Sequence, residues 1–332
     1  MPLFARLGQG FYWENHVKIA YKLRLGAMGK ILVTGATGFI GGHIVRALRA
    51  AGEEVVCLVR PSSDRRALEA AGAMHAFGDL GDAESLYRVL PGVSGVIHAA
   101  AMLKAPWRAN FGSVNVNGTA SLAAACAAQP EPPVLVVVSS LAAAGPAPST
   151  QPRTETVAPS PISIYGRVKL EAENAAAALA DELPVSIVRP PMVFGEGDRS
   201  ALALYKFARS GWQPLPGNPL HRVSMIHAAD LADLLLAVLR GGERVGYAAG
   251  SGVYYASADE MPALGELGAL VAAAIGRPPP RVIPVPLAVL RLAATFGELK
   301  GRITDTPQLM NLDKAHELSS GPWLCSAQKA RR

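Results

Sequence analysis

The feature that most constrains this chain is a glycine-rich run, residues 34–41 (TGATGFIG), between an apolar segment and an amphipathic one. Lys30 to Thr34 is short and rich in branched residues, as in a buried parallel strand. After the run, Ile40, Ile44 and Leu48 recur every fourth residue, which is the period of a helix with one apolar stripe. The pattern therefore predicts a strand, a tight turn and a helix in that order.

The three glycines of this run occupy the positions that a phosphate-binding turn requires. Gly35 allows a tight turn, Gly38 lets the backbone approach a pyrophosphate, and Gly41 lets helix and strand pack closely. The free amides at the start of the helix bind an anion. A glycine-rich turn without a ligand stays open at this point, because isolated glycine patterns occur often.

The end of the next predicted strand bears on the choice of dinucleotide. Glu54 to Val59 is followed by Arg60, where an acidic residue would hydrogen-bond the ribose hydroxyls of NAD. An arginine suits a 2′-phosphate, so the sequence favours NADP(H) over NAD(H), with NAD(H) as the alternative. Arg65 and Arg66 either add charge there or form a solvated helix face. Asp79, at the end of a third strand, is either an adenine contact or a turn residue.

A second segment supplies candidate chemistry. The apolar strand from Val134 ends in two hydroxyls, Ser139 and Ser140, at the kind of strand end where open α/β sheets bind ligands. Of the eight tyrosines, only Tyr165 has a lysine four residues later, and one helical turn places Tyr165 and Lys169 on one face. We expect the ammonium to lower the pKa of Tyr165, which would then act as general acid or base.

In the same interpretation, Ser140 holds the substrate oxygen, Lys169 also holds the nicotinamide ribose, and the cofactor carries the hydride. A surface pair of Tyr165 and Lys169 without a catalytic role is the alternative.

These segments together resemble the extended short-chain dehydrogenase/reductase family, of the NAD-dependent epimerase/dehydratase type. The resemblance implies an α/β fold: a Rossmann-type, doubly wound parallel sheet with a smaller C-terminal substrate lobe. It also implies a homodimer built on helices that include the one bearing Tyr165. The matching segments run nearly end to end: Thr34 to Gly42, Val96 to Ala101, Asn115 to Thr119, Val138 to Ser140, Tyr165 to Lys169, Arg189 to Pro191 with Gly195, and Ile226 to Asp230.

Residue by residue, the resemblance implies catalytic roles for Ser140, Tyr165 and Lys169. Ser140 is preferred to Ser139 because the family pattern through Gly145 assigns the role to it. Ala99 to Ala101 and Pro191 are expected to line the nicotinamide side. The full set of expected cofactor contacts is Gly35, Thr37, Gly38, Phe39, Ile40, Gly41, Arg60, Asp79, Leu80, Ala99, Ala100, Ala101, Tyr165, Lys169 and Pro191.

Two departures from the family pattern argue against a sugar-nucleotide substrate. Sugar-nucleotide epimerases and dehydratases usually carry a tyrosine where this chain has Ala144, and an arginine where it has Val223, with Arg222 one step off. The stretch 139–146 is more similar to the 3β-hydroxysteroid dehydrogenase and dihydroflavonol reductase branches, which act on apolar alcohols and ketones. Candidate substrate contacts, each also readable as ordinary core, are Met102, Trp107 and Phe194.

Composition fits one soluble α/β enzyme: 50% of the 332 residues are hydrophobic, so the chain can bury a substantial core. The net charge of +6 comes from residues 1–30 and 301–332, and residues 31–300 are formally neutral, so nucleic acid is not an expected partner. Three cysteines, Cys57, Cys126 and Cys325, make neither a metal spacing nor an even disulfide set, which favours reduced thiols in the cytoplasm.

No metal site is expected, because neither His98 nor His227 has a second ligand at metal spacing. Asp230, three residues after His227, is expected to cap a helix from Leu231 to Leu239.

The expected organisation places a dinucleotide-binding domain at residues 29–190, with returning pieces around 223–250. Residues 191–222 and 251–332 are expected to form the substrate lobe, where Pro278 to Pro280 break one helix and Pro284 to Pro286 start another. Residues 1–28 are interpreted as an extension upstream of the usual start; membrane contact through residues 1–27 is the less favoured interpretation. The C-terminal segment resembles one that normally continues into a further helix.

The sequence thus predicts an enzyme that transfers hydride between NADP(H) and a secondary alcohol or ketone of a small apolar or steroid- or flavonoid-like substrate, with Tyr165 as general acid or base. The rival enzyme hypothesis is an NDP-sugar epimerase or dehydratase with tightly bound NAD(P). A protein that binds NAD(P) without catalysis is the third hypothesis.

Overall fold

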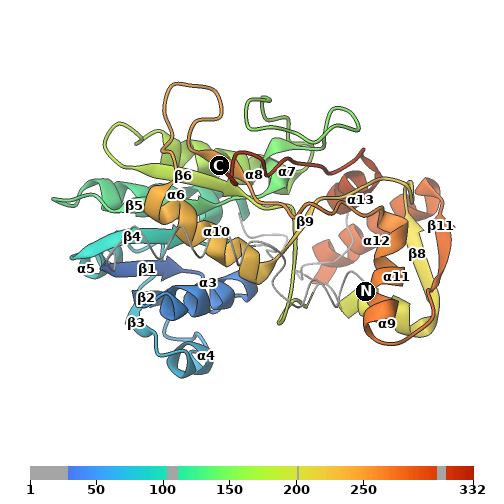
Figure 1. Cartoon of the computed structure of the whole chain (residues 1–332), viewed down its shortest axis with the longest axis horizontal. Coiled ribbons are helices and arrows are strands. Elements are labelled where there is room, and N and C mark those ends of the chain that lie inside the picture. Colours follow the sequence, from blue (N-terminus) through green and yellow to red (C-terminus); the bar gives the residue numbers. More distant parts are fainter. Residues whose placement is uncertain (1–28, 103–110, 200–201, 305–311) are drawn as a thin grey trace.

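The computed structural model describes residues 29–102, 111–199, 202–304 and 312–332. A seven-stranded sheet in the order β10-β6-β5-β4-β1-β2-β3 forms the larger half, and each of its strand pairs is parallel (Figure 1). The strands of the sheet are β1 (Lys30–Thr34), β2 (Glu54–Val59), β3 (Met74–Phe77), β4 (Val93–His98), β5 (Val134–Val138), β6 (Val185–Arg189) and β10 (Val253–Tyr255). The doubly wound parallel sheet expected from the sequence is confirmed.

The central strands are continuous apolar runs because both faces of the sheet are buried. In β1, Ile31 and Val33 pack into one core cluster, whereas Leu32 packs into the cluster on the opposite face. Cys57 and Cys126 also lie on opposite faces of the sheet, Cys57 in the first cluster and Cys126 in the second. All three cysteines are buried thiols, and burial raises the pKa of each to about 12.

Helices cover both faces of this sheet. Helices α3 and α10 pack against each other on one face, and Figure 1 shows them side by side in front of the strands. Helices α5, α6 and α8 cover the other face. The helices of this half are α3 (Phe39–Ala50), α4 (Arg66–Ala70), α5 (Ala83–Val89), α6 (Phe111–Ala127), α7 (Leu141–Ala144), α8 (Ile164–Ala177) and α10 (Ala228–Gly241).

A smaller lobe lies beyond the carboxyl ends of the strands, at the right of Figure 1. It contains two parallel strand pairs, β7 (Met192–Phe194) with β9 (Met225–His227), and β8 (Trp212–Pro216) with β11 (Arg281–Val285). Its helices are α9 (Leu202–Ser210), the 3₁₀ helix η1 (Leu264–Glu266), α11 (Leu267–Ala274), α12 (Leu287–Thr304) and α13 (Leu312–Ser319). None of the described helices has the length and apolarity needed to cross a bilayer.

Three local expectations differ from the structure. Strand β10 pairs with β6 in the large sheet, although residues 251–332 were expected in the smaller lobe. Pro284 lies in β11 rather than at a helix start, and α12 begins after Pro286. Proline is tolerated in β11 because the strand has a free edge, where no amide donor is needed. His227, not Asp230, caps α10: its Nδ1 accepts a hydrogen bond of 3.2 Å from the Ala229 amide.

Candidate active site

The candidate site lies where the strand order of the sheet changes direction. β1 has β2 on one side and β4 on the other, and ligands of open α/β sheets bind in the crevice at the carboxyl ends of such a strand pair. Gly35 follows β1, and Ala99 and Ala100 follow β4. These two segments touch, since a Cβ on Gly35 would lie 2.6 Å from the Ala100 nitrogen.

The glycine turn has no room for side chains. Gly35 has a φ of +71°, which L side chains rarely adopt, and a Cβ on Gly41 would lie 2.1 Å from the Gly35 carbonyl oxygen. Gly38 is the N-cap of α3 and offers no side chain to its first turn. The turn therefore carries no side chain at these three positions, which is the arrangement that a dinucleotide pyrophosphate fits.

A buried histidine joins the ends of β1 and β4. The Thr119 hydroxyl donates to the Asn115 carbonyl, so it accepts from His98 Nε2 at 3.0 Å. The other ring nitrogen, Nδ1, then accepts from the Thr34 hydroxyl at 2.7 Å. Burial, aided by the charge of Lys169, lowers the pKa of His98 to about 3, so the ring is neutral. His98 is thus a structural link between the cofactor strands.

The three expected catalytic side chains come together at the carboxyl end of β5. Ser140 caps α7 by accepting from the Ala142 amide at 3.1 Å, and it is hydrogen-bonded to the phenol of Tyr165. Lys169, one turn along α8, donates from Nζ to the Val138 carbonyl at 2.8 Å. Gly166 allows the close approach of the two helices, since its Cβ would lie 2.3 Å from the Ala142 oxygen.

The pKa of Tyr165 shifts in the opposite direction to the one expected from the sequence. Burial of the phenol raises the pKa of Tyr165 to about 12; the bond with Ser140 lowers it and the charge of Glu317 raises it further. Lys169 is not among the groups that move this pKa, and its ammonium is bonded to the Val138 carbonyl. Burial lowers the pKa of Lys169 to about 8, although Glu173 opposes the shift.

A buried ion pair beneath the three residues was not anticipated from the sequence. Glu173 receives hydrogen bonds from Arg189 Nε at 2.9 Å and Nη2 at 2.6 Å, and a third from the hydroxyl of Ser139. Ser139 is thereby occupied, which leaves Ser140 as the hydroxyl that meets Tyr165. A signal was present, because Tyr165, Lys169 and Glu173 recur every fourth residue on one face of α8.

Helix α13 also reaches the site, from far along the chain. Asp313 accepts a hydrogen bond of 2.8 Å from the amide of Ile164, the first residue of α8. Glu317 is buried and accepts from Lys314 through Oε2 at 2.8 Å, whereas its buried Oε1 has no hydrogen-bond partner among the described residues. No sequence pattern connects residues separated by some 150 positions, so these contacts could not be foreseen.

The expected adenosine-side residues take different positions. Arg60 is exposed after β2, and among the described residues nothing hydrogen-bonds or pairs with its guanidinium. Arg66 pairs with Asp64, and Arg65 lies over the Phe77 ring at 5.1 Å. Asp79 accepts from the Gly81 amide at 2.9 Å, which is the turn role, and its carboxylate is exposed. The neighbouring Leu80 packs against α6, where a Cβ on Gly118 would lie 3.1 Å from its Cβ.

The expected substrate-side residues are only partly brought together. Ala101 is exposed, Pro191 is half-buried, and the loop at Met102 is held by Asn115 through hydrogen bonds of 2.7 and 3.0 Å. Phe194 packs into the core cluster of the smaller lobe and meets the His227 ring at 5.4 Å. Trp107, like the expected extension 1–28, lies outside the described residues.

A doubly wound sheet with a glycine cradle and a Ser-Tyr-Lys cluster defines the extended short-chain dehydrogenase/reductase class. Comparison with known families agrees: the chain belongs to the NAD-dependent epimerase/dehydratase family, whose model matches residues 31–248. It is therefore an NAD(P)-dependent enzyme of that family.

Among curated proteins, the chain is similar to the ceramide reductase of Caulobacter vibrioides, with 33% identity over 306 residues covering 91% of this chain and 87% of that protein. It is also similar to the 2-alkyl-3-oxoalkanoate reductase of Stenotrophomonas maltophilia, with 29% identity over 75% of this chain and 76% of the relative. The crystal structure of Thermus thermophilus UDP-glucose 4-epimerase in complex with NAD shares the fold, with a TM-score of 0.69, 23% identity and coverage of 91% and 92% of the two chains.

The glycine geometry makes a prediction about cofactor binding. Gly41→Ala forces a Cβ against the Gly35 oxygen and should raise the dissociation constants of NADPH and NADH at least tenfold, about 1.4 kcal/mol. Gly42→Ala is the matched control, because the nearest atom to its Cβ is Arg46 Nη1 at 3.7 Å. Fluorescence titration measures both variants. Equal affinities in Gly41→Ala and Gly42→Ala would show that the turn does not hold the cofactor.

Proposed function

We propose that this protein is an NADP(H)-dependent reductase that converts a ketone carrying apolar alkyl chains to a secondary alcohol. The observation that supports this most is the hydrogen bond between Tyr165 and Ser140, beside a buried Lys169 at the carboxyl end of β5. Two hydroxyls that meet there can both reach one carbonyl oxygen, while the glycine cradle at β1 holds the phosphates of the dinucleotide.

The bound cofactor supplies a hydride to the carbonyl carbon. Tyr165 donates its phenolic proton to the carbonyl oxygen, and Ser140 donates a hydrogen bond to the same oxygen as negative charge develops on it. The ammonium of Lys169, held by the Val138 carbonyl, places a positive charge one helical turn from the phenol. The Glu173–Arg189 pair fixes α8 against the ends of β5 and β6, and so positions Tyr165 and Lys169.

The protonation state of Tyr165 favours the reductive direction. With a pKa of about 12, the phenol is protonated at neutral pH and is ready to act as an acid. Alcohol oxidation would need the phenolate, which is the minor form at pH 7. Reduction therefore starts from the resting state of the site.

The residues at the two positions that differ from sugar-nucleotide enzymes support an apolar substrate over a sugar nucleotide. Ala144, where sugar-nucleotide enzymes usually carry a tyrosine, is fully buried in a cluster with Leu141 and Tyr255. Val223 is buried as well, and Arg222 Nε donates to the Met261 carbonyl at 2.6 Å. The two curated relatives, named as a ceramide reductase and a 2-alkyl-3-oxoalkanoate reductase, favour a lipid-like substrate.

The NDP-sugar epimerase or dehydratase is the runner-up, because the matching family and the NAD-bound structural neighbour include that chemistry.

We also infer a preference for NADP(H), since the exposed guanidinium of Arg60 follows the strand end where a 2′-phosphate would lie. The homodimer built on helices that include α8, and the cytoplasmic location, stay predictions.

Removal of the proton donor tests the proposal. Tyr165→Phe should lower kcat for NADPH-dependent ketone reduction by roughly 10²- to 10⁴-fold while NADPH still binds. Tyr87→Phe, a change of an exposed helix tyrosine, is the control and should have wild-type activity. The assay follows net NADPH consumption with a panel of long-chain 3-oxo compounds.

Interconversion of UDP-sugars without net NADPH consumption would contradict a reductase and support the epimerase. Cofactor binding without turnover of any of these substrates, together with an intact cellular effect of Tyr165→Phe, would support the binding-protein hypothesis.

The buried lysine predicts the pH dependence of reduction. Lys169 is charged below its pKa of about 8 and neutral above it, whereas Tyr165 keeps its proton up to about 12. We expect kcat to be constant at neutral pH and to fall as pH rises through about 8, with no separate loss from tyrosine ionisation below about 12. Steady-state rates measured across the alkaline range check this; a constant rate well past the lysine pKa would contradict it.

The cofactor preference has its own test. Arg60→Ala should weaken NADPH binding by about tenfold and leave NADH binding nearly unchanged, because only NADPH carries the 2′-phosphate. Arg88→Ala is the matched control, because Arg88 is exposed and pairs with Glu84 on α5. Titrations of both nucleotides decide the point: equal affinity for NADPH and NADH, unaffected by the change at Arg60, would rule out the preference.

A further inference from the structure

Helix α12 presents an apolar face to the outside of the protein. Its inward side is a narrow stripe, Leu290 and Ala294, that packs against Val285 and Ala315. The face defined by Val289, Leu292, Phe296 and Leu299 is exposed, with 54%, 59%, 64% and 52% of each residue accessible. We call these four residues the α12 face.

The α12 face is a coherent surface rather than a scatter of single residues. With 3.6 residues per turn, its four side chains fall within one quarter of the helix circumference, on the side opposite Leu290 and Ala294. Exposed apolar side chains also recur elsewhere in the same lobe. They are Leu202 and Tyr205 on α9, Trp212 on β8, Leu220, Ile283 on β11, and Leu287 at the start of α12.

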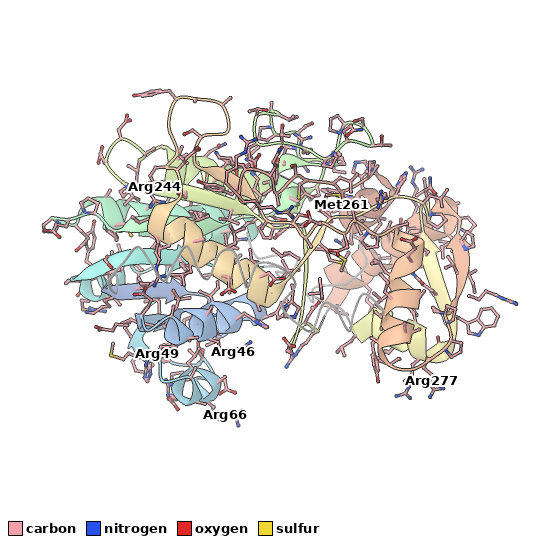
Figure 2. All side chains as sticks on the ribbon, viewed as in Figure 1. Arg46, Arg49, Arg66, Arg244, Met261 and Arg277 are labelled. Atoms are coloured by element: carbon pink, nitrogen blue, oxygen red, sulfur yellow. The ribbon has the colours of Figure 1, made fainter. Side chains whose placement is uncertain are left out.

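Two segments of the same lobe are rich in basic side chains. Residues 199–216 and 264–300 contain seven basic side chains, all exposed, and two acidic ones, so these segments carry a net charge of +5. The acidic residues are Glu266 and Glu298; the basic ones are Arg199, Lys206, Arg209, Arg277, Arg281, Arg291 and Lys300. Figure 2 shows Arg277 at the outer end of the lobe, pointing away from the sheet.

We propose that the α12 face and the basic residues of these two segments dock the smaller lobe onto the surface of an anionic lipid bilayer. An amphipathic helix that lies in the membrane interface has this composition: an apolar face for the acyl boundary, and lysines and arginines for the anionic headgroups. A second copy of the chain fits less well, because a two-fold interface would oppose the same positive charge on both subunits.

The position of α12 relates this surface to the chemistry, and this step rests on the proposed function. α12 packs on α13, and Asp313 of α13 holds the amide of Ile164, next to Tyr165. A ketone with alkyl chains resides in a bilayer, so docking of this lobe places the catalytic helix near the phase that holds the substrate.

Vesicle co-sedimentation of the full chain tests the docking surface. Wild-type protein should pellet with vesicles of equal parts phosphatidylcholine and phosphatidylglycerol, less so in high salt, and should remain in solution with phosphatidylcholine alone. Leu292→Glu/Phe296→Glu should lower the partition coefficient by about tenfold or more. Tyr87→Glu, which adds a charge to an exposed helix of the other half, should bind like the wild type.

Arg291→Gln/Lys300→Gln should reduce binding to the anionic vesicles severalfold and so confirm the charge contribution. Wild-type protein that does not pellet with anionic vesicles, or Leu292→Glu/Phe296→Glu that pellets equally, would overturn the proposal. A wild-type dimer that the same double change converts to a monomer in light scattering would also overturn it and assign the face to a second copy. NADPH consumption with a water-soluble ketone, measured in parallel, reports the proposed function separately from docking.

Discussion

The buried carboxylate of Glu173 is the contact on which the geometry of the site depends. It is almost inaccessible to solvent, and it accepts hydrogen bonds from two nitrogens of Arg189 and from the hydroxyl of Ser139. A carboxylate and a guanidinium taken out of water are costly unless both are fully bonded, and loss of one partner typically costs about 3–5 kcal/mol. The arrangement therefore tolerates little displacement of α8 relative to β5 and β6. Because Lys169 and Tyr165 lie one and two turns before Glu173, the same constraint fixes their register.

The sequence determines the cofactor half closely because its signals are local. β1 and β2 have the bounds that the apolar runs predict, and α3 follows the glycine turn as its four-residue period indicates. The differences occur where tertiary contacts decide. β10 is three residues long and joins the sheet only because β6 lies beside it, and Pro284 is accommodated in β11 because that strand belongs to a two-stranded sheet. No local pattern carries that information.

The proximity of the candidate site residues could be predicted from the sequence, but their electrostatics could not. The spacing of Tyr165 and Lys169 predicts a shared helix face, and the structure brings both to the end of β5 with Ser140. The pKa of Tyr165 was expected to fall because a lysine is near, yet Lys169 does not move this pKa and burial raises it. Burial is a property of the packed molecule. The charge of Glu317, on α13 in a distant part of the chain, raises the pKa of Tyr165 as well. The direction of a pKa shift is therefore the least predictable property of such a site.

The net charge of the sequence likewise does not show how charge is distributed in the folded protein. Residues 31–300 are formally neutral, which argues against a nucleic-acid partner when the charges are counted along the chain. Within this range, segments 199–216 and 264–300 of the smaller lobe nevertheless hold seven exposed basic residues and two acidic ones, so the rest of the range has a net charge of −5. What distinguishes these basic segments from a nucleic-acid surface is the apolar face of α12 beside them. A phosphate backbone offers nothing to cover Leu292 and Phe296, whereas a bilayer offers both headgroups and acyl chains.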